Sequence, residues 1–106
     1  MDEWVRVAAE TESFSARGFE VGGRRVAVFR TPEGLFALDD ICSHEYSLLS
    51  EGEVWDCEVY CPKHGSRFSL VDGAVTGLPA TDPVATWKVK TEAGGIWVAS
   101  PEAGDP

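Results

Sequence analysis

The sequence predicts an all-β domain, built as an antiparallel β-sandwich or small barrel. Short β-rich runs alternate with glycine-centred turns along most of the chain, and no helical period of useful length is present. Strands of about 4–8 residues with a turn every 8–12 residues are typical of this class. With 106 residues, of which 43% are hydrophobic and 25% are charged, the chain has room for a single domain, 1–106, with one core.

The expected strands follow one another with clear turn signals between them. Gly22-Gly23 predicts a two-residue hairpin, because both turn positions accept a positive φ. Pro32-Glu33-Gly34, Asp72-Gly73 and Gly94-Gly95 predict further tight turns, since proline presets φ and glycine supplies a left-handed residue. The runs that we expect to form strands are 4–9, 18–21, 24–30, 35–38, 58–60, 84–91 and 96–99.

Two polar segments interrupt this rhythm. Residues 39–56 carry few strand signals and include Ile41-Cys42-Ser43-His44, whereas residues 61–68 read Cys-Pro-Lys-His-Gly-Ser-Arg-Phe. Loops supported by a rigid β scaffold carry binding and catalytic residues more often than the strands do. We therefore expect these two segments to form a site.

The charge of the chain limits the class of partner. The formal net charge of −9 argues against nucleic acid, because phosphate binding needs clustered Lys and Arg side chains. An acidic surface suits a protein that meets a basic patch on another protein, and it equally suits a protein that only needs to stay in solution. The acidity therefore leaves both interpretations open.

Composition also bears on location. No run approaches the roughly 20 apolar residues needed to cross a bilayer, and the acidic segment 1–6 lacks the basic start and apolar run of a signal peptide. We therefore expect a cytoplasmic protein without membrane contact. The three cysteines are an odd number, which argues against a disulfide framework and favours metal ligation in a reducing compartment.

Two short motifs carry the chemistry. Cys42-x-His44 and Cys61-x-x-His64 lie 16 residues apart and contain both histidines and two of the three cysteines of the chain. Thiolate and imidazole are ligands for soft and borderline metals, and close spacing lets one loop supply two of them. A single cysteine or histidine is more often a buried thiol or a satisfied polar residue. The joint pattern predicts a metal site.

Two metal groups suit these four ligands. A tetrahedral zinc ion would make the chain a colourless, redox-silent interaction module. However, zinc fingers usually pair cysteine with cysteine and histidine with histidine, whereas each motif here carries one of each. The mixed order favours a 2Fe–2S cluster in which one iron takes both cysteines and the other takes both histidines.

Together with its surroundings, this ligand pattern resembles the Rieske family. The resemblance covers about residues 4–99 and includes, besides the two motifs, Leu35–Asp40, Ser50-Glu51-Gly52, Cys61–Gly65 and the proline-bearing segment Gly77-Leu78-Pro79-Ala80. It implies the Rieske fold: a β-sandwich base with a small two-loop cluster-binding subdomain. The implied boundaries are a base over about 1–40 and 69–100, a subdomain over about 41–68, a covering loop over about 77–80 and a frayed tail over 100–106.

The resemblance also implies a function. One 2Fe–2S cluster would be held by Cys42 and Cys61 on the inner iron and by His44 and His64 on the outer, surface iron. Small Rieske proteins of this kind are ferredoxin components of bacterial aromatic-ring-hydroxylating dioxygenases. The chain would then be a monomeric electron carrier and no enzyme. It would pass single electrons from a flavin-dependent ferredoxin reductase to a terminal non-haem iron oxygenase.

The chain departs from the high-potential branch of the family. Ser47 and Lys63 occupy the positions of the disulfide found in that branch, and the remaining thiol, Cys57, would lie too far from Cys61 along a strand to replace it. We interpret Cys57 as a structural or incidental thiol. Ser66 occupies the position of a serine that donates a hydrogen bond toward the cluster, or it merely favours the turn after Gly65.

The tyrosine that donates a second such bond in that branch is absent. Phe68 stands in its place and has no hydroxyl, so we expect a reduction potential toward the low end of the Rieske range. With Ser66 and the covering Pro79, Phe68 completes the expected surroundings of the ligands.

Two enzymatic interpretations are excluded by the residues present. A mononuclear iron oxygenase site needs two histidines and a carboxylate, but both histidines already belong to the motifs. A reductase needs a glycine-rich dinucleotide fingerprint, which the sequence lacks.

Overall fold

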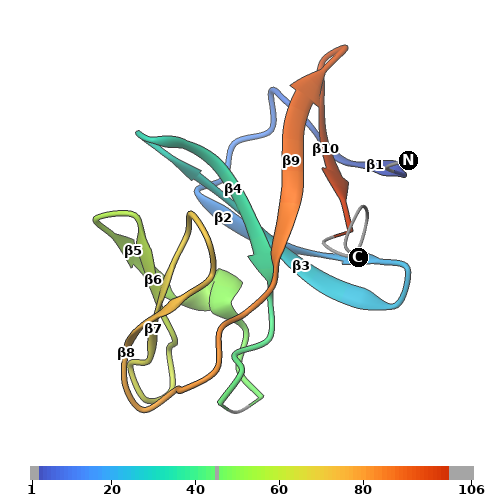
Figure 1. The fold of residues 1–106 in the computed structure, drawn as a ribbon. Coiled ribbons are helices and arrows are strands. Elements are labelled where there is room, and N and C mark those ends of the chain that lie inside the picture. Colours follow the sequence, from blue (N-terminus) through green and yellow to red (C-terminus); the bar gives the residue numbers. More distant parts are fainter. Residues whose placement is uncertain (1–2, 45, 101–106) are drawn as a thin grey trace.

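The structure is a computed structural model that describes residues 3–44 and 46–100. Within these residues all strands pair antiparallel, in two sheets, and the only helix is one 3-10 turn (Figure 1). The elements are β1 (Trp4–Ala9), β2 (Ala16–Val21), β3 (Arg24–Thr31), β4 (Gly34–Asp39), η1 (Leu49–Glu51), β5 (Glu53–Trp55), β6 (Glu58–Tyr60), β7 (Arg67–Ser69), β8 (Val75–Gly77), β9 (Thr86–Glu92) and β10 (Gly95–Ala99). The expected all-β antiparallel fold is confirmed.

The two sheets divide the molecule into a larger and a smaller part. The larger sheet has the order β1-β10-β9-β4-β3-β2, and the smaller sheet has the order β5-β6-β7-β8. All six strands of the larger sheet fall inside the ranges expected for the base, and the smaller sheet runs from residue 53 to residue 77. The boundaries between base and cluster-binding subdomain stay a prediction. The expected frayed tail lies, apart from Ser100, outside the described residues.

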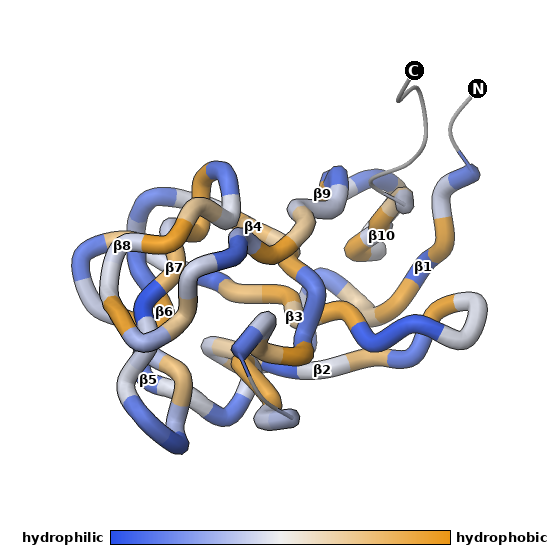
Figure 2. The backbone as a smooth tube through the Cα atoms, turned by 60° about the horizontal axis from the view of Figure 1, so that its bottom comes forward, coloured by the Kyte–Doolittle hydropathy of each residue, from blue (hydrophilic) through white to orange (hydrophobic). Residues whose placement is uncertain are grey.

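Strand β3 is the central element of the core because its two faces are both buried. Ala27 and Phe29 point into a cluster shared with the smaller sheet, whereas Val26 and Val28 point into a second cluster inside the larger sheet. All four side chains are fully buried. Successive strand residues face opposite sides, so four consecutive apolar residues are needed to fill both clusters. The hydrophobic stretch of β3 runs through the middle of the molecule in Figure 2.

Most expected strands form, with shifted ends. The run expected over 84–91 begins at Thr86 as β9, and β2 begins two residues earlier than expected, at Ala16. Three strands were not expected: β5, β7 and β8 are only three residues long and contain polar or charged side chains. Among the described residues, no helix has the length and apolar character needed to span a bilayer.

The Gly22-Gly23 hairpin turn has the positive φ angles that the sequence predicted. Gly22 and Gly23 have φ values of 59° and 83°, as a turn with two left-handed residues requires. The last hairpin differs by one residue from the expectation, because Ala93 and Gly94, with φ values of 52° and 77°, form the turn and Gly95 already belongs to β10. Ala93 therefore occupies a backbone region that disfavours a Cβ atom.

Replacing Ala93 should stabilise the protein. Ala93→Asn would give the hairpin an Asn-Gly turn, and asparagine tolerates the left-handed region better than alanine does. We expect a gain of about 1 kcal/mol, or several degrees in Tm, in thermal unfolding followed by circular dichroism. As the control, Gly94→Ala in the same exposed turn should lower the Tm, because a Cβ there meets no neighbour and only the backbone strain changes. A Tm that does not rise in Ala93→Asn would contradict this account.

Candidate metal centre

The first motif lies on a short hairpin that leaves the end of β4. The amide of Leu49 donates to the carbonyl of Asp40 at 2.6 Å, Ile41 bridges to Leu48, and the amide of Cys42 donates to the carbonyl of Ser47 at 2.9 Å. Backbone bonds thus close this loop step by step up to Cys42. The cysteine is buried and His44, beyond the last of these bonds, is exposed.

The second motif begins where β6 ends. The amide of Cys61 donates to the carbonyl of Ser66 at 2.7 Å, and the amide of Gly65 donates back to the carbonyl of Cys61 at 3.0 Å. Gly65 has a φ of 77°, which permits this tight turn. Cys61 is only 2% exposed, whereas His64 projects into solvent.

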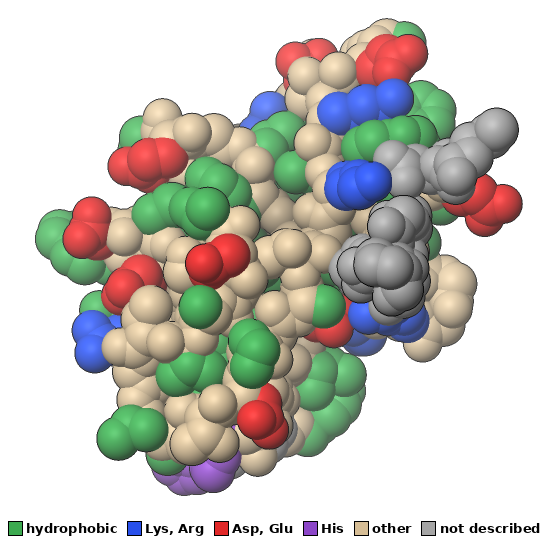
Figure 3. Space-filling model, in the orientation of Figure 1, with side chains coloured by type: hydrophobic (Ala, Val, Ile, Leu, Met, Phe, Trp, Pro, Cys, Tyr) green, Lys and Arg blue, Asp and Glu red, His purple; other side chains and the backbone are tan. Residues whose placement is uncertain are grey.

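The two loops bring like residues together. The rings of His44 and His64 lie with their centroids 6.3 Å apart and their planes at 76°. In the space-filling view they occupy one end of the molecule (Figure 3). Cys42 and Cys61 belong to the same buried hydrophobic cluster. The four residues singled out from the sequence therefore form an inner pair of thiols and an outer pair of imidazoles.

This arrangement fits a binuclear cluster. A tetrahedral zinc site gathers four protein donors around one ion. A 2Fe–2S group of the Rieske type takes two donors at each of two irons, with thiolates on one and imidazoles on the other. Two buried cysteines and two exposed histidines, with one of each supplied by either loop, fit the second requirement.

A comparison of the sequence with models of known protein families points to the same type of metal group. Residues 3–88 match the family model for the Rieske 2Fe–2S domain. The chain belongs to the Rieske family. Membership implies one 2Fe–2S cluster as its resident group, which confirms the cofactor expected from the two motifs.

Relatives and solved structures narrow the type of Rieske protein. The ferredoxin subunit of 3-phenylpropionate/cinnamic acid dioxygenase from Shigella flexneri serotype 5b is 40% identical over 79 residues, which cover 74% of each chain. The ferredoxin of carbazole 1,9a-dioxygenase from Nocardioides aromaticivorans IC177 superposes with a TM-score of 0.83 at 33% identity, over 91% of this chain and 96% of that one. This Rieske chain is accordingly an electron carrier of the ferredoxin type.

A third similar structure contains an electron acceptor. It is a complex of reduced oxygenase and oxidised ferredoxin in carbazole 1,9a-dioxygenase, which superposes with a TM-score of 0.82 at 30% identity. The match covers 90% of this chain and 100% of that one. A chain of this Rieske fold therefore docks on an oxygenase in that complex.

The loop after β8 is tied to both ligand loops through serine hydroxyls. The amide of Ala80 donates to Ser66 Oγ at 2.9 Å, and Ser43 Oγ donates to the carbonyl of Asp82 at 2.5 Å. Ser66 is fully buried. The sequence offered two roles for it, and the structure adds a third, because its oxygen anchors the loop that carries Pro79. Sequence reasoning missed Ser43, although this residue stands between Cys42 and His44 in the first motif.

Phe68 is packed against the inner end of the site. Its side chain is fully buried in the cluster that contains Cys42 and Cys61, and it faces Val59 across the β6–β7 pair. With no hydroxyl, the ring offers no donor to a nearby sulfur. The apolar surroundings of the thiols agree with the expected low potential, which stays a prediction.

Adding a hydroxyl at this position should raise the reduction potential. In Phe68→Tyr, an O–H group beside a ligand sulfur would stabilise the additional negative charge of the reduced state. We expect protein-film voltammetry to show a higher potential than in the unaltered protein. Phe68→Leu serves as the control, since it changes the packing without adding a donor. A tyrosine variant with the same potential as the leucine variant would count against a hydrogen bond to sulfur.

Cys57 belongs to neither ligand motif. With Asp56 it forms the β5–β6 turn, where the two residues have φ values of 60° and 55°. Burial raises the pKa of the Cys57 thiol, and the carboxylates of Glu33 and Asp56 raise it further. Cys57 and Cys61 are not in a disulfide, as expected from their spacing.

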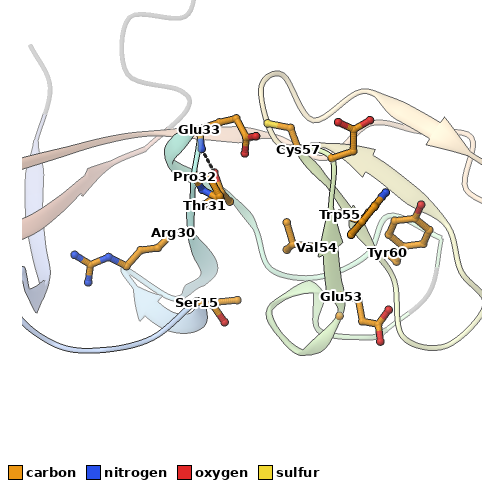
Figure 4. A pocket seen from close by; sticks show the side chains of 13 residues that line it. Ser15, Arg30, Thr31, Pro32, Glu33, Glu53, Val54, Trp55, Cys57 and Tyr60 are labelled. Atoms are coloured by element: carbon orange, nitrogen blue, oxygen red, sulfur yellow. Dashed lines mark hydrogen bonds between the residues drawn. The ribbon is translucent and has the colours of Figure 1, made fainter.

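A groove borders this turn. It has a volume of about 910 Å³ and lies between the β3–β4 turn, with Pro32 and Glu33, and the β5–β6 hairpin, with Val54, Trp55 and Cys57 (Figure 4). None of the four proposed ligands lines it. Cys57 lines this groove and also packs, half-buried, against the hydrophobic cluster that contains Cys42 and Cys61.

Proposed function

We propose that this Rieske chain passes single electrons to the terminal non-haem iron oxygenase of an aromatic-ring-hydroxylating dioxygenase system. Electrons would come from a flavin-dependent ferredoxin reductase. The observation that carries the proposal is the exposed pair of His44 and His64 above two buried cysteines. A redox group held this way has one side at the protein surface, where a docked partner can reach it. The ferredoxin relatives support the oxygenase as that partner.

In this proposal, Cys42 and Cys61 hold the inner iron and His44 and His64 hold the outer iron. When bound, the cluster supplies one reversible electron, and its two neutral imidazoles make reduction easier than four thiolates would. The chain supplies the surroundings. Its apolar core excludes water from the thiol side, while Ser43 and Ser66 hold the loop that carries Pro79.

Two exposed apolar side chains close in sequence to the proposed site suit brief contacts with partners. Tyr46 and Leu78 are 69% and 76% exposed, and each lies close in sequence to a residue of the proposed site. Small apolar contacts of this kind permit docking without long residence, as a shuttle requires. The net charge of −9 would draw the chain toward basic surfaces.

A cytoplasmic monomer is part of the same proposal. The two buried clusters are completed within the described residues of one chain. The radius of gyration of 12.9 Å is that of a compact single domain of this length. A flavin reductase draws its electrons from reduced nucleotides that the cytoplasm supplies.

Substituting the proposed ligands tests the metal site. The purified protein should be red-brown and give an EPR signal after reduction with dithionite. Cys42→Ala, Cys61→Ala, His44→Ala and His64→Ala should each lose the visible absorption, because each removes one of two protein ligands from an iron. The matched control, Cys57→Ala, should keep the spectrum unchanged. A colourless protein with one zinc per chain would instead show a structural module.

Reoxidation by an oxygenase tests the partner. We expect the reduced protein to be reoxidised by the purified oxygenase component of 3-phenylpropionate dioxygenase in stopped-flow absorption. The rate should fall as salt rises from about 0.02 to 0.5 M, because screening weakens the attraction between an acidic carrier and a basic docking site. Leu78→Ser, which removes an exposed apolar contact without changing the charge, should lower the rate further at any salt concentration. Reoxidation no faster than in buffer would refute the dioxygenase role while leaving the cluster intact.

A further inference from the structure

A buried carboxylate stands directly before the first ligand loop. Asp40 follows β4, precedes Cys42 by two residues and is 0% exposed. Its carboxylate accepts three hydrogen bonds: from the amide of Ser50 at 2.7 Å, from the hydroxyl of Ser50 at 3.0 Å and from Arg25 Nη2 at 2.8 Å. A buried charge is tolerated only when it is paired and hydrogen-bonded in this way.

The space for this carboxylate is made by a glycine on the neighbouring strand. Gly18 lies on β2, and a Cβ atom there would collide with Arg25 Nη2 and Asp40 Oδ2 and would lie 3.0 Å from Ser50 Oγ. The glycine is therefore needed for a close approach of side chains. Residues from β2, β3 and η1 thus converge on one carboxylate.

The contacts of Asp40 close the first ligand loop at its base. Its backbone carbonyl accepts from Leu49, and its amide donates to the carbonyl of Arg25 at 3.0 Å. Its side chain binds Ser50, at the far end of the loop. The bridge between Ile41 and Leu48 and the bond from Cys42 continue from there. Asp40 thus makes the first contacts of the ladder, at the base of the loop, and the ladder continues from there to Cys42.

The ion pair itself adds little to stability. Arg25 Nε is buried and has no hydrogen-bond partner, which offsets part of what the pair contributes. Buried ion pairs in general add little net stability, because desolvation cancels much of the attraction. The clearer consequence of the Arg25–Asp40 pair is geometric. Arg25 holds Asp40 at the start of the loop, and Asp40 in turn holds Ser50 at its end, so both ends are fixed to the larger sheet.

We propose that Asp40 is a positioning residue for the proposed ligands Cys42 and His44. Its carboxylate holds the start and the end of their loop against Arg25, in the space left by Gly18. The inference rests on the proposed ligand roles. Beyond those roles, the inference states that the carboxylate of Asp40, which binds neither iron, holds the ligand loop in place for the cluster.

The neighbouring residue provides a matched control. Asp39 also pairs with an arginine, Arg24, at 3.1 Å, and it accepts a hydrogen bond from Trp87 Nε1 at 2.8 Å. It is half-buried, and its side-chain bonds link β4 to β3 and β9 rather than to the ligand loop. Asp39→Asn and Asp40→Asn therefore make the same chemical change one residue apart. Only Asp40→Asn removes contacts of the ligand loop.

The experiment compares these two variants as holoproteins and as apoproteins. In Asp40→Asn, an amide NH₂ would face the donors of Arg25 or Ser50 and would separate the two ends of the loop. We expect roughly tenfold faster loss of visible absorption in the presence of an iron chelator, and a changed EPR line shape. In the apoprotein, the amides of Leu49 and Cys42 should exchange hydrogen for deuterium faster. Asp39→Asn should match the unaltered protein in all three measurements.

A milder variant covers the case in which Asp40→Asn does not fold. Ser50→Ala removes only the hydroxyl donor and should give a smaller acceleration in the same direction. Release rates and EPR spectra that stay unchanged in the folded variants would overturn the inference, as would equal acceleration in Asp39→Asn. An unaltered protein that binds no cluster would instead refute the proposed function, so the two failures can be told apart.

Discussion

The burial of both faces of β3 is the constraint on which the rest of the molecule depends. One face, with Ala27 and Phe29, packs into the cluster that holds Cys42 and Cys61, and the other face completes the interior of the larger sheet. Losing one such side chain, as in Phe→Ala, typically costs about 3–5 kcal/mol, a large part of the 5–15 kcal/mol that stabilises a whole domain. The two thiols therefore sit in a core that the scaffold must form in any case.

Polar contacts then decide where the ligand loops point. Hydrophobic burial is not directional, so packing alone would leave the loops several orientations. The buried carboxylate of Asp40 fixes the base of one loop, and the hydroxyls of Ser43 and Ser66 fix the segment between Ala80 and Asp82 to both loops. These hydrogen bonds join residues 10, 39 and 14 positions apart, so they connect segments that lie far from one another in the sequence.

Features that depend on neighbouring residues were predictable from the sequence, and features that depend on distant ones were not. The two ligand motifs and the Gly22-Gly23 turn are local patterns: the turn forms as expected, and the motifs lie on loops whose histidine rings approach each other. The strand Glu53–Trp55 contains two strand-forming residues, Val54 and Trp55, but is too short to be recognised without its pairing with β6. Ala93 gives no hint of a left-handed residue. The contact of Gly18 with Asp40 joins residues of different strands, so only the folded chain reveals it.

The burial of the cysteines has a consequence for biogenesis. Cys42 and Cys61 are 4% and 2% exposed, so a scaffold protein that delivers iron and sulfide cannot reach them in the closed form. Iron and sulfide must therefore arrive before the chain has buried the two cysteines, or a local opening of the protein must expose both thiols together. In the folded form, Ala80 is fully buried in the same cluster as both thiols, so this opening would also have to release the bond from Ala80 to Ser66.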